Sequence, residues 1–316
     1  MNPAPILVCA HLDERAQRLL RESVPGDQLR FVPRAELRPG HPVLAAAEIA
    51  FGNIPGPLLA AAPRLRWMQL ESVGFEYYQD PAHQKPGLVI TNLKGMFEWP
   101  ATETALGGLL ALARGYTELI PAQAGRRWVE LEVRPRTWTL HGRPALVLGA
   151  GSIGRRMRLL LEAFECRVQV YARSSPDATV RRPEDLPAAF AASEIVVCCL
   201  PKTPATIGLI GRELLRALPP SAVFVNIGRG AVVDEAALVE VMHERRFRGA
   251  VVDVTYAEPV PPDHPLWSCP NTIVTQHTGG GYADELLDKA RCFLANLNRH
   301  RAGQPVQNQV DMARGY

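Results

Sequence analysis

A glycine-rich turn between a short apolar segment and a helical pattern constrains the fold of this chain more than any other feature. Residues 145–148 are apolar and of strand length, Gly149-Ala-Gly-Ser-Ile-Gly154 follows, and apolar side chains then recur three or four positions apart from Met157 to Phe164. This order predicts a buried strand, a tight turn and an amphipathic helix. These three elements begin a doubly wound parallel sheet.

The three glycines of this turn have separate predicted roles. Gly149 can take the bend, Gly151 allows a pyrophosphate to approach the main chain, and Gly154 allows the helix and the strand to pack closely. The first amides of the helix would point at the anion, with the positive end of the helix dipole behind them. A glycine turn that binds nothing is the alternative, but its position between a strand and a helix favours dinucleotide binding.

The composition fits a globular protein of two domains. The chain has 316 residues, of which 47% are hydrophobic and 21% charged, and its formal net charge is +3. The small charge and scattered arginine pairs argue against nucleic-acid binding, and no apolar run approaches the length of a membrane span or an export signal. The six cysteines show no C-x-x-C spacing, so we expect reduced core residues in a cytoplasmic protein and no metal site.

Short apolar strands alternate with helical patterns along nearly the whole chain. This alternation predicts an α/β protein made of two doubly wound parallel-sheet domains. Residues 1–98 and 282–316 form the predicted first domain, and residues 99–281 form the predicted dinucleotide-binding Rossmann domain. A nearly all-apolar helix at 99–113 is expected to be buried between domains or subunits, and residues 126–142 to be a polar connection.

The residues after the second strand of the Rossmann domain indicate which cofactor it takes. That strand, at 166–171, leads into Ala172-Arg173-Ser174-Ser175, where an acidic residue would bind the adenosine ribose of NAD. No carboxylate is present there to repel a 2′-phosphate, and Arg173 and Ser174 can bind one. NADP(H) is therefore favoured over NAD(H), with Arg181 or Arg182 as a second cation. The alternative for Arg173 is a solvated arginine at a strand end.

Three further strands of the same domain lead into Arg229, Glu258 and His277. Because the carboxyl ends of parallel strands meet at one edge, we expect these side chains to line a single crevice. The glycine turn and the rigid loop that begins at Pro201 are expected at the same edge. In the first domain Ser72-Val73-Gly74 also follows a strand, and its amides could hold a carboxylate or form only an ordinary β–α turn.

These motifs, in this order, resemble the D-isomer-specific 2-hydroxyacid dehydrogenases. The resemblance rests on Gly149–Gly154, Asn226-Ile-Gly-Arg-Gly230, Asp253-Val-Thr-Tyr-Ala-Glu-Pro259 and His277-Thr-Gly-Gly280. It covers nearly the whole chain, including Ser72-Val73-Gly74, and is closest to the NADPH-dependent glyoxylate and hydroxypyruvate reductases. It implies a flavodoxin-like substrate domain hinged to a Rossmann domain, usually in a homodimer. The implied activity is reduction of a small 2-oxo acid to the D-2-hydroxy acid.

The resemblance also implies a role for each residue of the crevice. Arg229 would bind the substrate by spanning its carboxylate and carbonyl oxygens. His277 would act as general acid/base, and Glu258 would orient the imidazole and stabilise its charged form. The amides of Val73 and Gly74 would hold the substrate carboxylate.

The cofactor would meet a second set of residues. By the same resemblance, Asp253 contacts the nicotinamide carboxamide, while Ser152, Ile153 and Arg155 contact the pyrophosphate.

Some features leave alternatives open. Gln276 stands where the family usually has a proline before its histidine. Met96, Phe97 and Trp99 could shape an apolar side-chain pocket or pack at the hinge. The other functions are a dinucleotide-sensing, corepressor-like binding protein of the same fold and a dehydrogenase for a bulkier 2-oxo acid.

Overall fold

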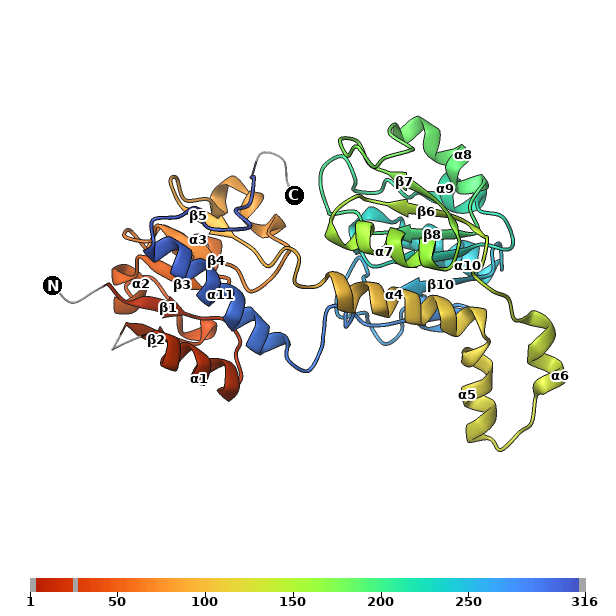
Figure 1. The fold of residues 1–316 in the computed structure, drawn as a ribbon, viewed down its shortest axis with the longest axis horizontal. Coiled ribbons are helices and arrows are strands. Elements are labelled where there is room, and N and C mark those ends of the chain that lie inside the picture. The colour runs from red at the N-terminus through yellow and green to blue at the C-terminus, as the bar shows by residue number, and fades with distance from the viewer. Residues whose placement is uncertain (1–3, 25–27, 313–316) are drawn as a thin grey trace. The chain divides into compact units, whose positions relative to one another are not determined.

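The computed structural model describes residues 4–24 and 28–312, and the chain divides into two compact units (Figure 1). One unit combines residues 1–96 with 282–316, and the other comprises residues 97–281. Each is built on one parallel β-sheet with helices on both faces, which confirms the predicted fold class. Buried strands of this kind are apolar throughout, because neither face of the sheet meets water.

The smaller unit has a five-stranded sheet in the order β2-β1-β3-β4-β5. Its elements are β1 (Ile6–Val8), α1 (Glu14–Ser23), β2 (Leu29–Phe31), α2 (Pro42–Ala46), β3 (Ile49–Phe51), α3 (Gly56–Leu59), β4 (Trp67–Gln69), β5 (Val89–Thr91) and α11 (Glu285–Arg301). Helices α2 and α3 pack on one face, and α1 and α11 on the other. Phe293 of α11 stacks on Phe51 of β3 with ring centroids 4.6 Å apart, so the returning helix completes this core.

The larger unit has a six-stranded sheet in the order β11-β10-β9-β8-β6-β7. Its elements are α4 (Glu98–Ala113), α5 (Tyr116–Ala124), α6 (Glu130–Val133), β6 (Pro144–Leu148), α7 (Ser152–Ala163), β7 (Arg167–Tyr171), α8 (Leu186–Ala191), β8 (Ile195–Cys198), α9 (Arg212–Ala217), β9 (Val223–Asn226), α10 (Glu235–His243), β10 (Gly249–Val252) and β11 (Thr272–Val274). The chain changes winding direction between β6 and β8, where open α/β sheets bind ligands. Beyond β7, Val180 forms a single parallel bridge to Tyr171 in place of a full outer strand.

Helix α4 packs one of its faces against the sheet of the larger unit. It buries Ala105, Gly108 and Leu109 against the sheet, but Trp99 is half exposed and Gly107 faces open space. A Cβ at Gly108 would lie 2.7 Å from Cγ1 of Val251, so this position requires glycine. One stripe of the helix thus meets the sheet of its own unit, and its burial between domains or subunits stays a prediction.

Residues 126–142 are not simply a polar connection. They include α6, which packs Val129 and Val133 against Ala122 of α5. Figure 1 shows α5 and α6 projecting together from the body of the larger unit as an arm. Helix α6 has only four residues, too few to display a helical period in the sequence.

Two properties of the chain follow from its burial and its helices: the reactivity of its thiols and whether a helix fits a membrane. All six cysteines are free, and burial raises the pKa of Cys9 and of Cys198 to about 12, so these thiols are inert core groups. Across the described residues, no helix is both long and apolar enough to cross a membrane.

Candidate active site

The glycine turn has the geometry that its sequence predicts. Gly149 adopts φ +111°, a region that favours glycine. A Cβ at Gly154 would lie 2.0 Å from the carbonyl oxygen of Gly149, so helix α7 can pack this closely only without a side chain there. Both residues therefore fix the turn, and neither needs to touch a ligand.

The space above this turn fits an anionic group. A Cβ at Gly151 would meet nothing within 4 Å, so the main chain is open to a ligand at that point. Gly151 caps α7 without any side-chain hydrogen bond, and Ser152 and Ile153 form its first turn. The amino end of this 12-residue helix thus presents main-chain donors and a positive dipole to whatever occupies that space.

The loop after β7 carries the residues that predict the cofactor. Arg173 and Ser174 are both exposed in this loop. Arg181 donates from Nη1 to the carbonyl oxygen of Ser175 at 3.0 Å, which holds it against the same loop. Arg182 instead forms a two-pronged pair with Asp185 at 2.7 and 3.0 Å and is the poorer second cation.

Arg155 points to this loop rather than only to the glycine turn. Its Nε lies 3.4 Å from a carboxylate oxygen of Asp177, and Arg158 lies 3.9 Å from the other oxygen. Asp177 therefore ties the loop after β7 to helix α7. Sequence reasoning missed this residue because its partners lie 22 and 19 positions earlier, on another element.

His277 and Glu258 form a direct pair at the carboxyl edge of the larger sheet. Nδ1 of His277 lies 2.6 Å from Oε2 of Glu258, while Oε1 of Glu258 accepts a hydrogen bond from the amide of Thr255 at 3.0 Å. Both carboxylate oxygens are thus held, and the ring nitrogen that faces Glu258 is Nδ1. Nε2 has no partner in the part of the chain that the structure describes, so this nitrogen is the one able to exchange a proton with a ligand.

Asp253 organises the loop that carries His277. Its buried carboxylate accepts hydrogen bonds from the hydroxyl of Thr275 at 2.6 Å and from the amide of Gly279 at 3.0 Å. Its carbonyl oxygen accepts from the amide of His277 at 2.6 Å. The predicted contact of Asp253 with a nicotinamide is thus accompanied by a structural role that sequence reasoning missed.

The departure from the family pattern at Gln276 has a structural counterpart. Gln276 and His277 both adopt left-handed backbone conformations, with φ +55° and +57°. Proline cannot adopt such a φ, because its ring fixes φ near −65°. The loop therefore presents His277 to Glu258 through a conformation that a proline at position 276 would forbid.

We expect Gln276→Pro to lower kcat about 10- to 100-fold and stability by about 1–3 kcal/mol, because the loop must rebuild around the new φ. Gln276→Asn is the matched control, since asparagine tolerates left-handed backbone and should stay close to the wild type. Steady-state kinetics and thermal unfolding measure both effects. Full activity in Gln276→Pro would contradict this loop conformation.

Arg229 is held between two glycines whose positions admit no side chain. A Cβ at Gly230 would lie 1.9 Å from the carbonyl oxygen of Thr255, and one at Gly228 would lie 2.6 Å from that of Leu200. The loop of Arg229 is thus pressed against the loops after β8 and β10, and the second of these leads to Glu258. Pro201 follows Leu200, and its carbonyl oxygen accepts from the hydroxyl of Thr206 at 2.6 Å, so its loop is also ordered.

The turn Ser72-Val73-Gly74 lies in the smaller unit and is held by two asparagines. Asn53 accepts from the amide of Glu71 at 3.1 Å and donates to the hydroxyl of Ser72 at 3.2 Å. Asn92 donates to the carbonyl oxygen of Val73 at 2.8 Å. Sequence reasoning missed both asparagines, because each follows a different strand and nothing in its own neighbourhood marks it.

The side chains at the start of α4 pack against their own unit. The guanidinium of Arg156 lies 4.1 Å above the ring of Trp99 and 3.2 Å from the carboxylate of Glu98. The ring of Phe97 lies so close to Gly280 that an added Cβ there would be 3.0 Å away. Phe97 and Trp99 thus pack within the larger unit, whereas Met96 is half-buried in the smaller unit, and the pocket and hinge roles of the three stay predictions.

Comparisons with known proteins match most of the larger unit to a family model and nearly the whole chain to known enzymes. Residues 106–279 match the family described as D-isomer specific 2-hydroxyacid dehydrogenase, NAD binding domain. The chain is 31% identical to glyoxylate/hydroxypyruvate reductase B of Pectobacterium atrosepticum, over 98% of both proteins. It is 30% identical to hydroxyphenylpyruvate reductase of Plectranthus scutellarioides, over 80% of each.

Solved structures give the same result. The D-isomer specific 2-hydroxyacid dehydrogenase from Xanthobacter autotrophicus Py2, solved in complex with NADPH and MES, matches with a TM-score of 0.83 and 29% identity over 99% of both chains. Two parallel-sheet units, one of them matching an NAD binding domain, make up a nicotinamide-dependent oxidoreductase. The chain belongs to the D-isomer-specific 2-hydroxyacid dehydrogenase family.

Proposed function

We propose that this protein reduces a small 2-oxo acid of the glyoxylate or hydroxypyruvate type to the D-2-hydroxy acid, with NADP(H) preferred over NAD(H). The observation that carries the proposal is the 2.6 Å pair between His277 and Glu258 at the strand edge that also bears the glycine turn. The reductase of Pectobacterium atrosepticum supports the substrate class, and the NADPH complex of the Xanthobacter enzyme supports the cofactor.

The residues that would hold the cofactor are those around the open turn. Gly151, Ser152 and Ile153 would bind its pyrophosphate through main-chain amides, and Asp253 would meet its carboxamide. When bound, the reduced nicotinamide supplies the hydride.

His277 and Glu258 would manage the proton that the reduction requires. As the carbonyl oxygen of the substrate gains negative charge, imidazolium Nε2 of His277 would donate a proton to it. Glu258 would fix the ring through Nδ1, so the ring does not turn away from the substrate.

Arg229 and the turn Ser72-Val73-Gly74 would bind the substrate. The guanidinium would span the carboxylate and the carbonyl oxygen, polarising the carbonyl and selecting one face of the substrate. Amides of Val73 and Gly74 would bind the far side of the carboxylate, and Asn53 and Asn92 keep that turn in shape.

We expect Arg173→Asp to lower kcat/KM for NADPH about 100-fold and to change that for NADH little, because an acid replaces the cation nearest the 2′-phosphate. Arg182→Met is the matched control, since Arg182 is already paired with Asp185. Both cofactors are titrated at one fixed concentration of 2-oxo acid. An unchanged cofactor preference in Arg173→Asp would refute the role of this arginine.

A kinetic screen tests the proposed activity. NADPH and NADH oxidation is followed with glyoxylate, hydroxypyruvate, pyruvate and phenylpyruvate, and we expect the highest kcat/KM with NADPH and one of the first two. A preference for phenylpyruvate would favour the bulkier substrate class, which the hydroxyphenylpyruvate reductase of Plectranthus scutellarioides also represents. No oxidation with any of them would refute the proposal and favour a dinucleotide-sensing binding protein.

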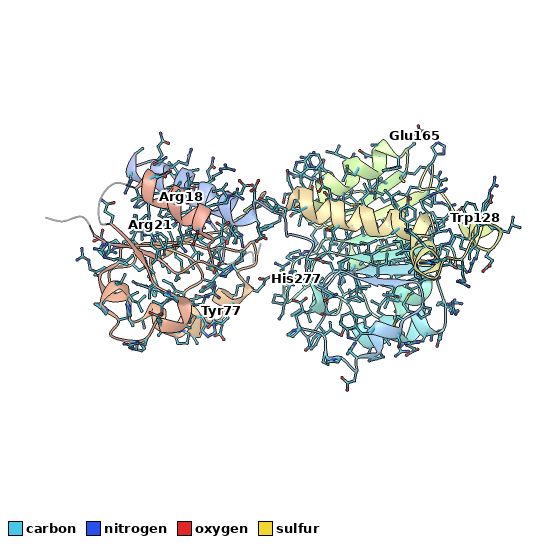
Figure 2. The ribbon with its side chains drawn as sticks, turned by 90° about the horizontal axis from the view of Figure 1, so that it is seen from below. Arg18, Arg21, Tyr77, Trp128, Glu165 and His277 are labelled. Carbon is cyan, nitrogen blue, oxygen red and sulfur yellow. The ribbon has the colours of Figure 1, made fainter. Side chains whose placement is uncertain are left out.

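We also propose that the protein is a homodimer that forms through the arm of α5 and α6. Trp128 and Leu131 are 89% and 84% exposed, and Ile120 is 64% exposed, an arrangement typical of an apolar surface that a partner covers. Figure 2 shows Trp128 at the end of the larger unit opposite His277, so pairing there would leave the proposed catalytic edge open. Free, mostly buried cysteines fit a reducing, cytoplasmic location.

A further inference from the structure

A polar cavity lies at the edge of the larger sheet opposite the proposed catalytic site. It has a volume of about 580 Å³. Arg248 lines it directly before β10, and Asn271 directly before β11, whereas Arg229, Glu258 and His277 all follow strands. Because every strand of this sheet is parallel and spans on the order of 15 Å, the two edges are separate places on the unit.

Arg248 is the feature of this cavity that calls for a ligand. Its Nη1 is buried and has no hydrogen-bond partner among residues 4–24 and 28–312. The guanidinium lies 5.0 Å from the ring centre of Trp138, and Arg143 lies 5.1 Å from the same ring. Burial, and then the nearby charge of Arg143, lower the pKa of Arg248. Arg248 as a whole is half-buried, and a guanidinium beside a second cation with no ion pair of its own favours an anion nearby.

The charges around the cavity leave a positive excess. Arg143 is balanced by an ion pair with Glu194, and Arg136 by Glu118 at 2.6 Å. Arg248 and the exposed Arg245, which also lines the cavity, form no ion pair in the described parts of the chain, although the charge of Glu194 opposes the lowering of the Arg248 pKa. Glu118 also lines this space but is paired with Arg136, so Arg248 and Arg245 leave the cavity with an excess of two positive charges.

We propose that this cavity binds a small, doubly charged oxyanion, either a phosphate group or a dicarboxylate. One side of the ligand would meet the half-buried guanidinium of Arg248 and the other would meet Arg245, with the hydroxyl of Thr117 as a neutral donor. The ligand would join the base of the α5–α6 arm, where Thr117 and Trp138 lie, to the edge of the sheet. The site is independent of the proposed catalytic reaction.

The test is titration of the full-length protein with inorganic phosphate, in parallel with succinate and with sodium chloride at matched ionic strength. Tryptophan fluorescence and the unfolding temperature are read at each concentration. We expect a saturable fluorescence change and a rise of several degrees in Tm with phosphate or with succinate, and neither with chloride. A response to only one of the two anions identifies which oxyanion chemistry the site prefers.

Variants distinguish phosphate binding in this cavity from phosphate binding at the glycine turn, whose main-chain amides can also bind an anion. Arg248→Met should weaken binding at least about tenfold, and Arg245→Met several-fold, because each removes a charge-assisted donor. Arg246→Met is the matched control: Arg246 is exposed and does not line the cavity, so its loss should change nothing. If circular dichroism shows that Arg248→Met does not fold, the binding measured with Arg245→Met tests the proposal instead. No saturable response in the wild type, or an equal response in the arginine variants that fold, would overturn the proposal.

Discussion

His277→Asn is expected to lower kcat about a thousandfold, because the substrate oxygen would lose its proton donor at the moment its charge develops. Asparagine tolerates the left-handed backbone at this position, φ +57°, so the loop should keep its path. The KM for the 2-oxo acid should change far less than kcat, since proton donation matters chiefly in the transition state. Steady-state kinetics with saturating NADPH measure both constants.

His243→Asn controls for the loss of a histidine as such. His243 ends helix α10 on the exposed surface, and its replacement should leave kcat unchanged. The unfolding temperature of His277→Asn should match that of the wild type closely, because the imidazole is half exposed and contributes little burial. Retention of more than a tenth of the wild-type kcat would exclude His277 as the proton donor.

The parts of the site that sequence reasoning predicted are those set by local backbone demands. Gly149 and Gly154 were predictable because a tight turn and a close helix–strand contact each require glycine within a few positions of the motif. Topology predicted that Glu258 and His277 share one edge, since the ends of parallel strands meet there whatever the intervening sequence, whereas their pairing was implied by the family resemblance.

The remaining features depend on contacts between distant segments. Asn53 and Asn92 support the turn at Ser72–Gly74 from two other loops, and an asparagine after a strand carries no sign of which loop it will meet. Trp138 and Arg248 are 110 positions apart, and only the paths of the arm and of β10 bring them together. In both cases the tertiary arrangement, rather than any local pattern, decides the function of the side chain.

Arg229→Met should have the largest effect of any single replacement, lowering kcat/KM for the 2-oxo acid about 10⁴-fold. The guanidinium is expected to contribute twice, by binding the carboxylate in the ground state and by stabilising the carbonyl oxygen in the transition state. KM should therefore rise while kcat falls. Arg229→Lys restores the charge but not the planar fork, so its kcat/KM should fall only about 100-fold.

Because main-chain contacts fix the loop of Arg229, Arg229→Met and Arg229→Lys should differ from each other only in the side chain. Gly228 and Gly230 fix the loop through backbone contacts with Leu200 and Thr255, and both glycines remain in either variant. Arg246→Met, the loss of an exposed arginine beyond helix α10, is the control and should be silent. Equal losses in Arg229→Met and Arg229→Lys would mean that the planar fork carries the whole effect. Wild-type kinetics in Arg229→Met would place the substrate carboxylate on other groups of the chain.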